Sequence, residues 1–194
     1  MIAASSGTTV ALADGAGSAA VALKLMPGAY QVRVRDASAA GGWVRTQIGE
    51  ADAAAGETLL VALTAVGTTE TGRSTLQSRL VVAGDTARTV LVRGLGPALA
   101  AQGIGTGTVD PVIEVRDANG ALIAVNDDWG SPEAGGVDAT ALAEAAGAAG
   151  GAALGPGSSD AAVLVTLAPG AYTVILSDPE NPVGLALLEV LAVP

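Results

Sequence analysis

Three adjacent residues, Asn126, Asp127 and Asp128, form the one cluster of hard oxygen ligands in the chain. Calcium binds about six to eight oxygens, commonly in a loop. Because adjacent side chains point in different directions, a calcium site would also need Glu133, Asp138 or a second loop. The alternative is a solvated loop whose side chains cap local turns. Calcium is therefore the one candidate cofactor, and both interpretations stay open.

Catalytic residue types are scarce. The chain has no His and no Cys, which removes the commonest bases, nucleophiles and metal ligands. A serine nucleophile would need Lys24 as its base, but Lys24 falls in the middle of an expected strand. Paired carboxylates could hydrolyse a glycosidic bond, yet two Trp, two Tyr and no Phe leave few rings to hold a sugar. We therefore predict that the protein is not an enzyme.

One stretch of sequence occurs twice, at residues 18–48 and 160–190, with a constant offset of 142. Pro-Gly-Ala-Tyr-x-Val recurs in register at residues 27–32 and 169–174, and Asp36 aligns with Asp178. About ninety residues of further strands precede the second copy, whereas seventeen residues precede the first. We therefore expect the chain to begin partway through a module and to hold half a module followed by a whole one.

The boundary between the two is expected at a polar run. Residues 67–72 read Gly-Thr-Thr-Glu-Thr-Gly, contain no apolar residue and are bounded by glycines, which is typical of a linker. We predict a partial β-module over residues 1–66 and a complete β-sandwich module over residues 67–194.

The composition favours β-sheets packed closely face to face over helices packed on a sheet. Half of the residues are apolar, but without Phe the core must be filled by Ala, Val and Leu, which suits two sheets packed face to face. The 27 Gly and 9 Pro indicate many turns. Together with short alternating segments, these features predict an all-β antiparallel sandwich, jelly-roll-like, with one or two short helices.

The expected elements follow from periodicity and turn residues. Expected strands are residues 8–13, 20–25, 29–36, 43–48, 57–64, 76–82, 87–93, 112–117, 121–126, 162–167, 171–177 and 185–193. Residues 117–120, Asp-Ala-Asn-Gly, are typical of a tight hairpin, and Gly28 is expected to supply a positive φ in its turn. The expected helices are residues 96–103 and 138–149, the second capped by Asp138 and with its better part ending at Gly147.

Charge excludes several partner classes. The net charge of −10 argues against nucleic acid and anionic membranes. The sequence contains no run of about 18 apolar residues, so no membrane-spanning helix is expected. The chain as written shows no signal peptide. Arg73, Arg79, Arg88 and Arg93 are expected to form surface ion pairs with acidic neighbours, which contribute little stability.

The two copies differ where side chains should face away from the core. A polar or small residue of the first copy becomes a larger apolar one in the second: Arg33 becomes Ile175, Arg45 becomes Leu187, and Ala22 becomes Leu164. The strands of the second copy therefore read as covered on both faces. The cover could be the helix of residues 138–149, the first half-module or another chain.

The two tryptophans are candidates for stacking a ligand. Trp43 aligns with Leu185 in the repeat, which favours ordinary strand packing. Trp129 lies beside Asp128 and Gly130 in an expected loop and is the better contact residue.

Three segments carry a resemblance to known proteins. They are residues 79–99, residues 125–130 (Val-Asn-Asp-Asp-Trp-Gly) and residues 160–174 with their Pro-Gly-Ala-Tyr-Thr-Val strand. In this order they resemble a β-sandwich module repeated in tandem in large secreted bacterial proteins. More distantly, they are similar to bacterial pre-peptidase C-terminal domains, which are small jelly-roll sandwiches on exported enzymes, some binding calcium and polymeric substrates. The resemblance implies an extracellular or cell-surface accessory or structural module.

The leading functional prediction is a structural protein that assembles with copies of itself by strand or sheet complementation. An unpaired sheet edge is a template for strand addition, and head-to-tail addition that does not close gives a filament. Residues 3–13 are the expected donor segment. The expected interface residues are Ile175, Leu187, Leu164, Trp129, Val10 and Leu12. The alternative is a non-catalytic, calcium-dependent module that binds an extracellular polymer, although the exposed aromatic row expected of it is missing.

Overall fold

A computed structural model describes residues 28, 30, 62–69, 75–108, 110–131, 136–180 and 184–194. The chain divides into two compact units, residues 1–60 and 61–194. Apart from Gly28 and Tyr30, every described residue belongs to the second unit. Apart from Tyr30, the strands expected before residue 57 therefore lie outside the described residues, as do the donor segment with Val10 and Leu12, Lys24 and Trp43.

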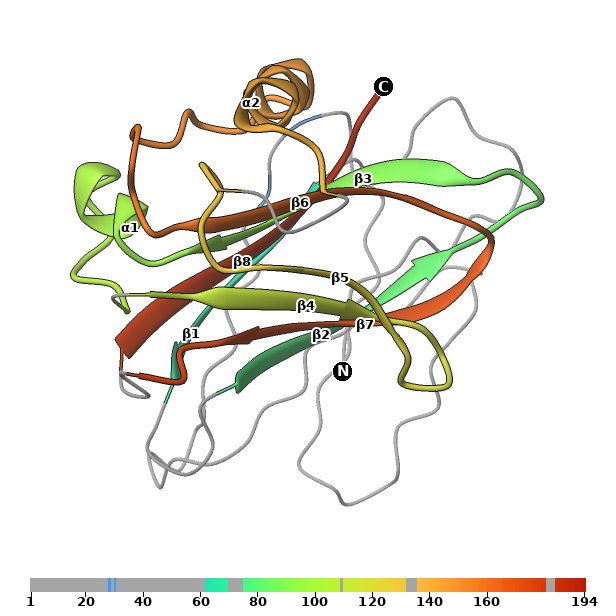
Figure 1. The fold of residues 1–194 in the computed structure, drawn as a ribbon, viewed down its shortest axis with the longest axis horizontal. Helices are drawn as coiled ribbons and strands as arrows, with labels where there is room; N and C mark the ends of the chain where they lie inside the picture. Colours follow the sequence, from blue (N-terminus) through green and yellow to red (C-terminus); the bar gives the residue numbers. More distant parts are fainter. Residues whose placement is uncertain are drawn as a thin grey trace, which may run out of the picture. The chain divides into compact units, whose positions relative to one another are not determined.

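The second unit is an antiparallel β-sandwich, as predicted (Figure 1). Its strands are β1 (Ala62–Thr69), β2 (Thr75–Val82), β3 (Arg88–Leu95), β4 (Val112–Arg116), β5 (Leu122–Asn126), β6 (Ala161–Leu167), β7 (Gly170–Ser177) and β8 (Gly184–Ala192). The first sheet has the order β1-β8-β3-β6, and the second has the order β2-β7-β4-β5. Every named strand pair is antiparallel.

The core between the sheets consists of Val, Leu, Ile and Ala, as the absence of Phe requires. Val92 of β3, Ile113 of β4 and Leu176 of β7 are completely buried in it. Alternation explains why these strands form, since every second residue faces this core. Burial of such side chains contributes about 1.5–3 kcal/mol each relative to leaving them exposed, which makes this layer the main source of stability.

Two helices lie on the outer face of the first sheet. α1 (Ala98–Ala101) follows Pro97, and α2 (Ala139–Ala148) begins after Asp138, whose Oδ1 accepts a hydrogen bond from the Ala141 amide at 2.8 Å. α2 contacts β6 and β3. Both helices and the Asp138 cap were predicted. Gly147 does not end the regular part of α2, however, because the helix continues to Ala148.

Strand β1 crosses the predicted module boundary. It pairs with β8 along its whole length, from Ala62 opposite Leu191 to Thr69 opposite Gly184. The predicted linker therefore begins as strand, because ladder hydrogen bonds use the backbone and threonine favours extended conformations. Residues 62–66, expected to belong to the partial module, lie in the edge strand of the complete sandwich.

The Pro-Gly-Ala-Tyr turn has the same local contact in both copies. A Cβ built on Gly28 would lie 3.6 Å from Cε2 of Tyr30, and one built on Gly170 would lie 3.7 Å from Cε2 of Tyr172. Neither glycine has a positive φ, so that prediction is wrong for Gly28. A Cβ at either position would make ordinary van der Waals contact with the tyrosine ring. The Tyr172 hydroxyl donates to the Ala168 carbonyl at 2.8 Å.

Candidate functional site

The outer face of the first sheet is covered by the chain's own helices. Leu91 and Leu191 pack with Leu142 of α2, and Leu164 packs against this cluster. Leu187 is buried with Leu95 and with Leu99 of α1. The predicted interface position Leu187 is therefore covered within the unit, which corrects its assignment to an intermolecular contact, and Leu164 is partly covered there. The helix was one of the three covers that the sequence left open.

A buried ion pair separates these two apolar clusters. Arg93 of β3 lies directly opposite Glu189 of β8, and its Nε is 2.8 Å from Glu189 Oε2. Only 2% of the Arg93 side chain and 16% of the Glu189 side chain are exposed. The arginine Nη1 also donates to the Ala152 carbonyl. Arg93 was expected in a surface pair, but α2 and the chain that follows it cover it.

A cavity lies beside Arg93, beneath α2. Its volume is about 120 Å³, and Leu91, Arg93 and Ala162 of the sheet line it. Ala146 of α2 and Trp129 also line it. The lining is largely apolar, and the guanidinium is the charged group in it.

Trp129 is held in this lining by hydrogen bonds. Its indole Nε1 donates to the Gly155 carbonyl and to Ser158 Oγ, both at 3.2 Å, and its amide donates to the Asp160 carbonyl at 2.8 Å. Asp160 is completely buried, and its carboxylate accepts from the Gly96 amide at 2.9 Å and from Ser158 Oγ at 2.8 Å. The side chain predicted to be a contact residue therefore helps to build the cavity.

The Asn126 side chain joins the loop after β5 to β6 by hydrogen bonds. It is buried, with Nδ2 donating to the Asp128 carbonyl at 2.9 Å and Oδ1 accepting from the Ala162 amide at 2.9 Å. The loop after β5 is thereby tied to β6. The Oδ1 atom that calcium would need already accepts a hydrogen bond from the Ala162 amide, so through this atom Asn126 joins two distant segments rather than capping a local turn.

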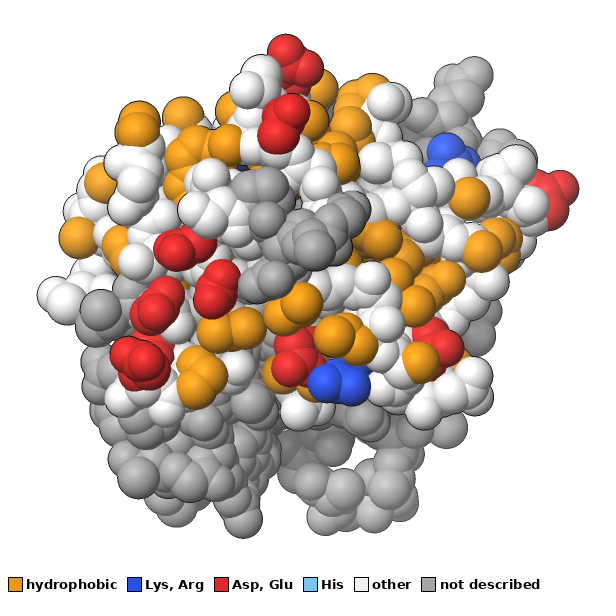
Figure 2. Space-filling view, viewed as in Figure 1, with side chains coloured by type: hydrophobic (Ala, Val, Ile, Leu, Met, Phe, Trp, Pro, Cys, Tyr) orange, Lys and Arg blue, Asp and Glu red, His pale blue; other side chains and the backbone are white. Residues whose placement is uncertain are grey.

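Five acidic residues lie near one another around this loop. Burial first, and then the negative charges of Asp128, Asp127, Asp178 and Glu180, raise the pKa of Asp110 above its ordinary value. Figure 2 shows acidic side chains gathered on one face of the molecule. Within the described ranges, no group of three or more acidic side chains converges closely enough to hold a metal ion.

Asp178 is a second buried carboxylate, and it was not among the site residues predicted from the sequence. It accepts hydrogen bonds from the Thr108 hydroxyl and from the Asp110 amide, the latter at 3.2 Å. It ties the segment before β4 to the end of β7. The repeat did contain a signal for this residue, because Asp36 occupies the corresponding position of the first copy.

The outer face of the second sheet has a different character. Ile175 is half-buried there, with Gln77 of β2 and Glu114 of β4 as its paired neighbours. Val81 and Leu122 on the same face are 58% and 49% exposed. Figure 2 shows hydrophobic side chains in the region of β4 and β5, with acidic and basic groups among them. In the described part of the chain, no helix covers this face.

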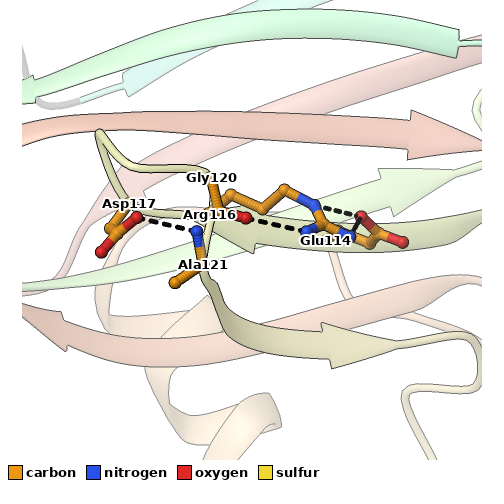
Figure 3. Close-up of polar contacts among 5 residues, drawn as sticks. All are labelled: Glu114, Arg116, Asp117, Gly120 and Ala121. Atoms are coloured by element: carbon orange, nitrogen blue, oxygen red, sulfur yellow. Dashed lines mark hydrogen bonds and ion pairs between the residues drawn. The ribbon is translucent and has the colours of Figure 1, made fainter.

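Two charged residues on this face, Arg116 and Glu114, form an ion pair. Arg116 Nη2 lies 2.7 Å from Glu114 Oε2, and Arg116 Nη1 donates to the Gly120 carbonyl at 2.9 Å (Figure 3). The predicted hairpin at residues 117–120 is confirmed, since Gly120 has a φ of 84° and Asp117 Oδ1 accepts from the Ala121 amide at 2.8 Å. The hairpin therefore orients Arg116 along the sheet beside Glu114.

The remaining chemistry is limited by residue type. The absence of His and Cys from the sequence leaves carboxylates, hydroxyls and Lys24 as the reactive groups. The buried carboxylates Asp160 and Asp178 are engaged in hydrogen bonds. No helix of the described segments is long and apolar enough to cross a membrane.

Comparison with known proteins gives one structural likeness to report. No protein-family model matches the chain, and no curated protein matches it. The 1.0 Å crystal structure of the pre-peptidase C-terminal domain of collagenase from Bacillus anthracis matches with a TM-score of 0.41 and 14% sequence identity. The match covers 67% of this chain and 89% of that chain.

Proposed function

We propose that the protein is a non-catalytic structural module of an extracellular or cell-surface protein, and that it assembles with further copies through the outer face of its second sheet. One observation carries the proposal. The two sheets are treated differently: α1 and α2 cover the outer face of the first, whereas the second presents Val81, Leu122 and Ile123, each between 45% and 58% exposed. Exposed apolar patches on soluble domains mark contact surfaces.

Charge favours a second copy as the occupant. The whole chain carries −10, so two copies repel each other over most of their surface. The outward strand positions of this face carry Arg79, Arg116 and Glu114, that is, two positive charges and one negative. A two-fold contact could also place each Arg116 against Glu114 of the other copy. This face is therefore where like copies approach at least electrostatic cost.

Filament growth needs a second, head-to-tail contact, because a two-fold face contact alone closes into a dimer. Within the described strands, β1 and β6 are the edges of the first sheet, and β2 and β5 are those of the second. We propose strand addition at such an edge as the second contact, with the segment containing Val10 and Leu12 as donor.

Replacing Ile175 with arginine tests the face contact. The first copy carries Arg33 at the corresponding position, so the strand should accept the change, but a contact would bury an additional charge. We expect the parent to show a concentration-dependent increase in mass by light scattering, and I175R to bind itself at least about tenfold more weakly.

The matched control is Thr140→Arg, which adds the same charge at an exposed position of α2. It should associate like the parent. A parent that stays monomeric at high concentration, or an I175R variant that associates as the parent does, would contradict the proposal. Far-ultraviolet circular dichroism checks that both variants remain folded.

A calcium-dependent polymer-binding module is the second candidate. It is supported by the acidic residues that surround Asp110, since a bound cation would relieve their mutual repulsion. Glu133 lies outside the described residues, and Asp138 Oδ1 already caps α2. On this candidate, calcium raises the melting temperature relative to chelator, and Asp127→Asn with Asp128→Asn reduces that increase. An identical melting temperature in calcium and in chelator excludes it.

A further inference from the structure

The guanidinium of Arg93 has hydrogen-bonding capacity that its known contacts do not use. Nε faces Glu189, and Nη1 donates to the Ala152 carbonyl. Within the described residues, no hydrogen bond from Nη2 is found, and Nη2 is not among the fully buried atoms that lack a partner, so a small molecule can reach it. Arg93 as a whole is only 1% exposed. An arginine donor left without a partner at such burial is costly unless something small reaches it.

The cavity that Arg93 lines is the space from which a partner can reach it. Its volume of about 120 Å³ is close to that of an engineered cavity of about 150 Å³ that binds benzene. The walls are the aliphatic Leu91, Leu142 and Leu154 together with the Trp129 ring. The space therefore suits a compact apolar body with one polar end.

The site is rigidly built. The Trp129 indole is fixed by Gly155 and Ser158, and a Cβ on Gly151 would lie 3.0 Å from Arg93 Nη1 and 2.9 Å from Leu191 Cδ1. Gly151 therefore lets the backbone close directly over the guanidinium. A preorganised donor and wall lower the entropy cost of binding a small ligand.

Charge determines the class of the ligand. Glu189 already neutralises Arg93 at 2.8 Å, so a carboxylate in the cavity would face the negative charge of Glu189 in a poorly solvated space. A neutral acceptor avoids that repulsion and still satisfies an arginine N–H.

We propose that the cavity beneath α2 binds a small neutral molecule with an apolar ring of about five or six atoms and one carbonyl group. The ring lies among the leucines and Trp129, and the carbonyl oxygen accepts a hydrogen bond from Arg93. This site is independent of the self-association face, which lies on the other sheet.

The test compares cyclohexanone with methylenecyclohexane, in which a methylidene group replaces the carbonyl oxygen. Binding to the full chain is followed by NMR through the Trp129 indole N–H and the Gly147 and Gly151 amides. We expect saturable shifts with cyclohexanone and an affinity for methylenecyclohexane at least about tenfold lower, the effect of one hydrogen bond to a charged donor. Absence of saturable shifts, or equal affinities, would overturn the proposal.

Variants distinguish the contribution of the Arg93 hydrogen bond from that of the cavity volume. Ala146→Leu fills the cavity and should abolish binding of both molecules; Ala143→Leu, at a more exposed position of the lining, is the second filling variant if the first does not fold. The double variant Arg93→Met with Glu189→Met removes the donor without stranding a charge and should bind both molecules equally. Two results would refute the site. One is cyclohexanone binding to a variant whose cavity is filled, and the other is tighter binding of cyclohexanone than of methylenecyclohexane to the double variant.

Discussion

Replacing Arg93 with methionine alone is expected to destabilise the sandwich by about 3–5 kcal/mol. The substitution leaves Glu189, whose side chain is 16% exposed, without its ion-pair partner in the middle of a covered sheet face. It also leaves the Ala152 carbonyl without its arginine donor. Because folded domains are stable by only about 5–15 kcal/mol, the effect should be plain in urea unfolding followed by circular dichroism.

The double variant Arg93→Met with Glu189→Met is the informative comparison. Apolar side chains of similar volume in place of a buried ion pair are often neutral or stabilising, because the desolvation of both charges is avoided. We expect the double variant to unfold within about 1 kcal/mol of the parent or later. If the double variant is as unstable as the single one, the cost does not come from a stranded charge, and this account of the pair is wrong.

Gly107→Ala is expected to be the second most damaging change. A Cβ on Gly107 would lie 2.0 Å from the Gly96 carbonyl oxygen, and one on Gly96 would lie 2.3 Å from the Thr108 carbonyl oxygen. Both obstacles are backbone atoms, so no side-chain rotation relieves them. Forced overpacking typically costs about 1–3 kcal/mol, and we expect the upper end of that range in thermal or urea unfolding.

Gly147→Ala is the matched control for that measurement. Nothing lies within 4 Å of a Cβ at Gly147, and the residue is inside α2. Alanine there should stabilise the protein by about 0.5–1 kcal/mol, because glycine loses more backbone entropy in a helix. A similar change in stability for both variants would show that close backbone approach does not determine the role of Gly107.

The strands of the sandwich could be predicted because their signals are local. Strand β7 was expected at residues 171–177 and is observed as Gly170–Ser177. It could be predicted because its signals are local: the alternation lies in the strand itself, and Pro169 and Gly170 come directly before the expected segment. The Asp138 cap and the Asn-Gly hairpin were found for the same reason: their hydrogen bonds join residues two to four positions apart.

The candidate sites could be predicted only in part, because they depend on distant residues. Comparison of the two copies placed Leu187 on an outward face, which is correct, and Arg93 was expected in a surface ion pair. Neither prediction could show that α1 and α2 cover that face. The partner of Asn126 Oδ1 is the amide of Ala162, thirty-six positions away. The triplet of residues 126–128 therefore resembled a metal site in the sequence, although Asn126 is hydrogen-bonded to the neighbouring strand β6.

The residues that could do chemistry thus divide into two groups. Composition by itself determined that histidine and cysteine chemistry is absent, and periodicity determined an antiparallel sandwich, because both are properties of residue type and of local spacing. Only the tertiary structure decided that Arg93 is buried beside a cavity, that Asn126 is engaged and that Ile175 lies on the sheet whose outer face no described helix covers. The physical reason is that burial depends on which segments pack together over long separations, and the sequence carries no local signal for that choice.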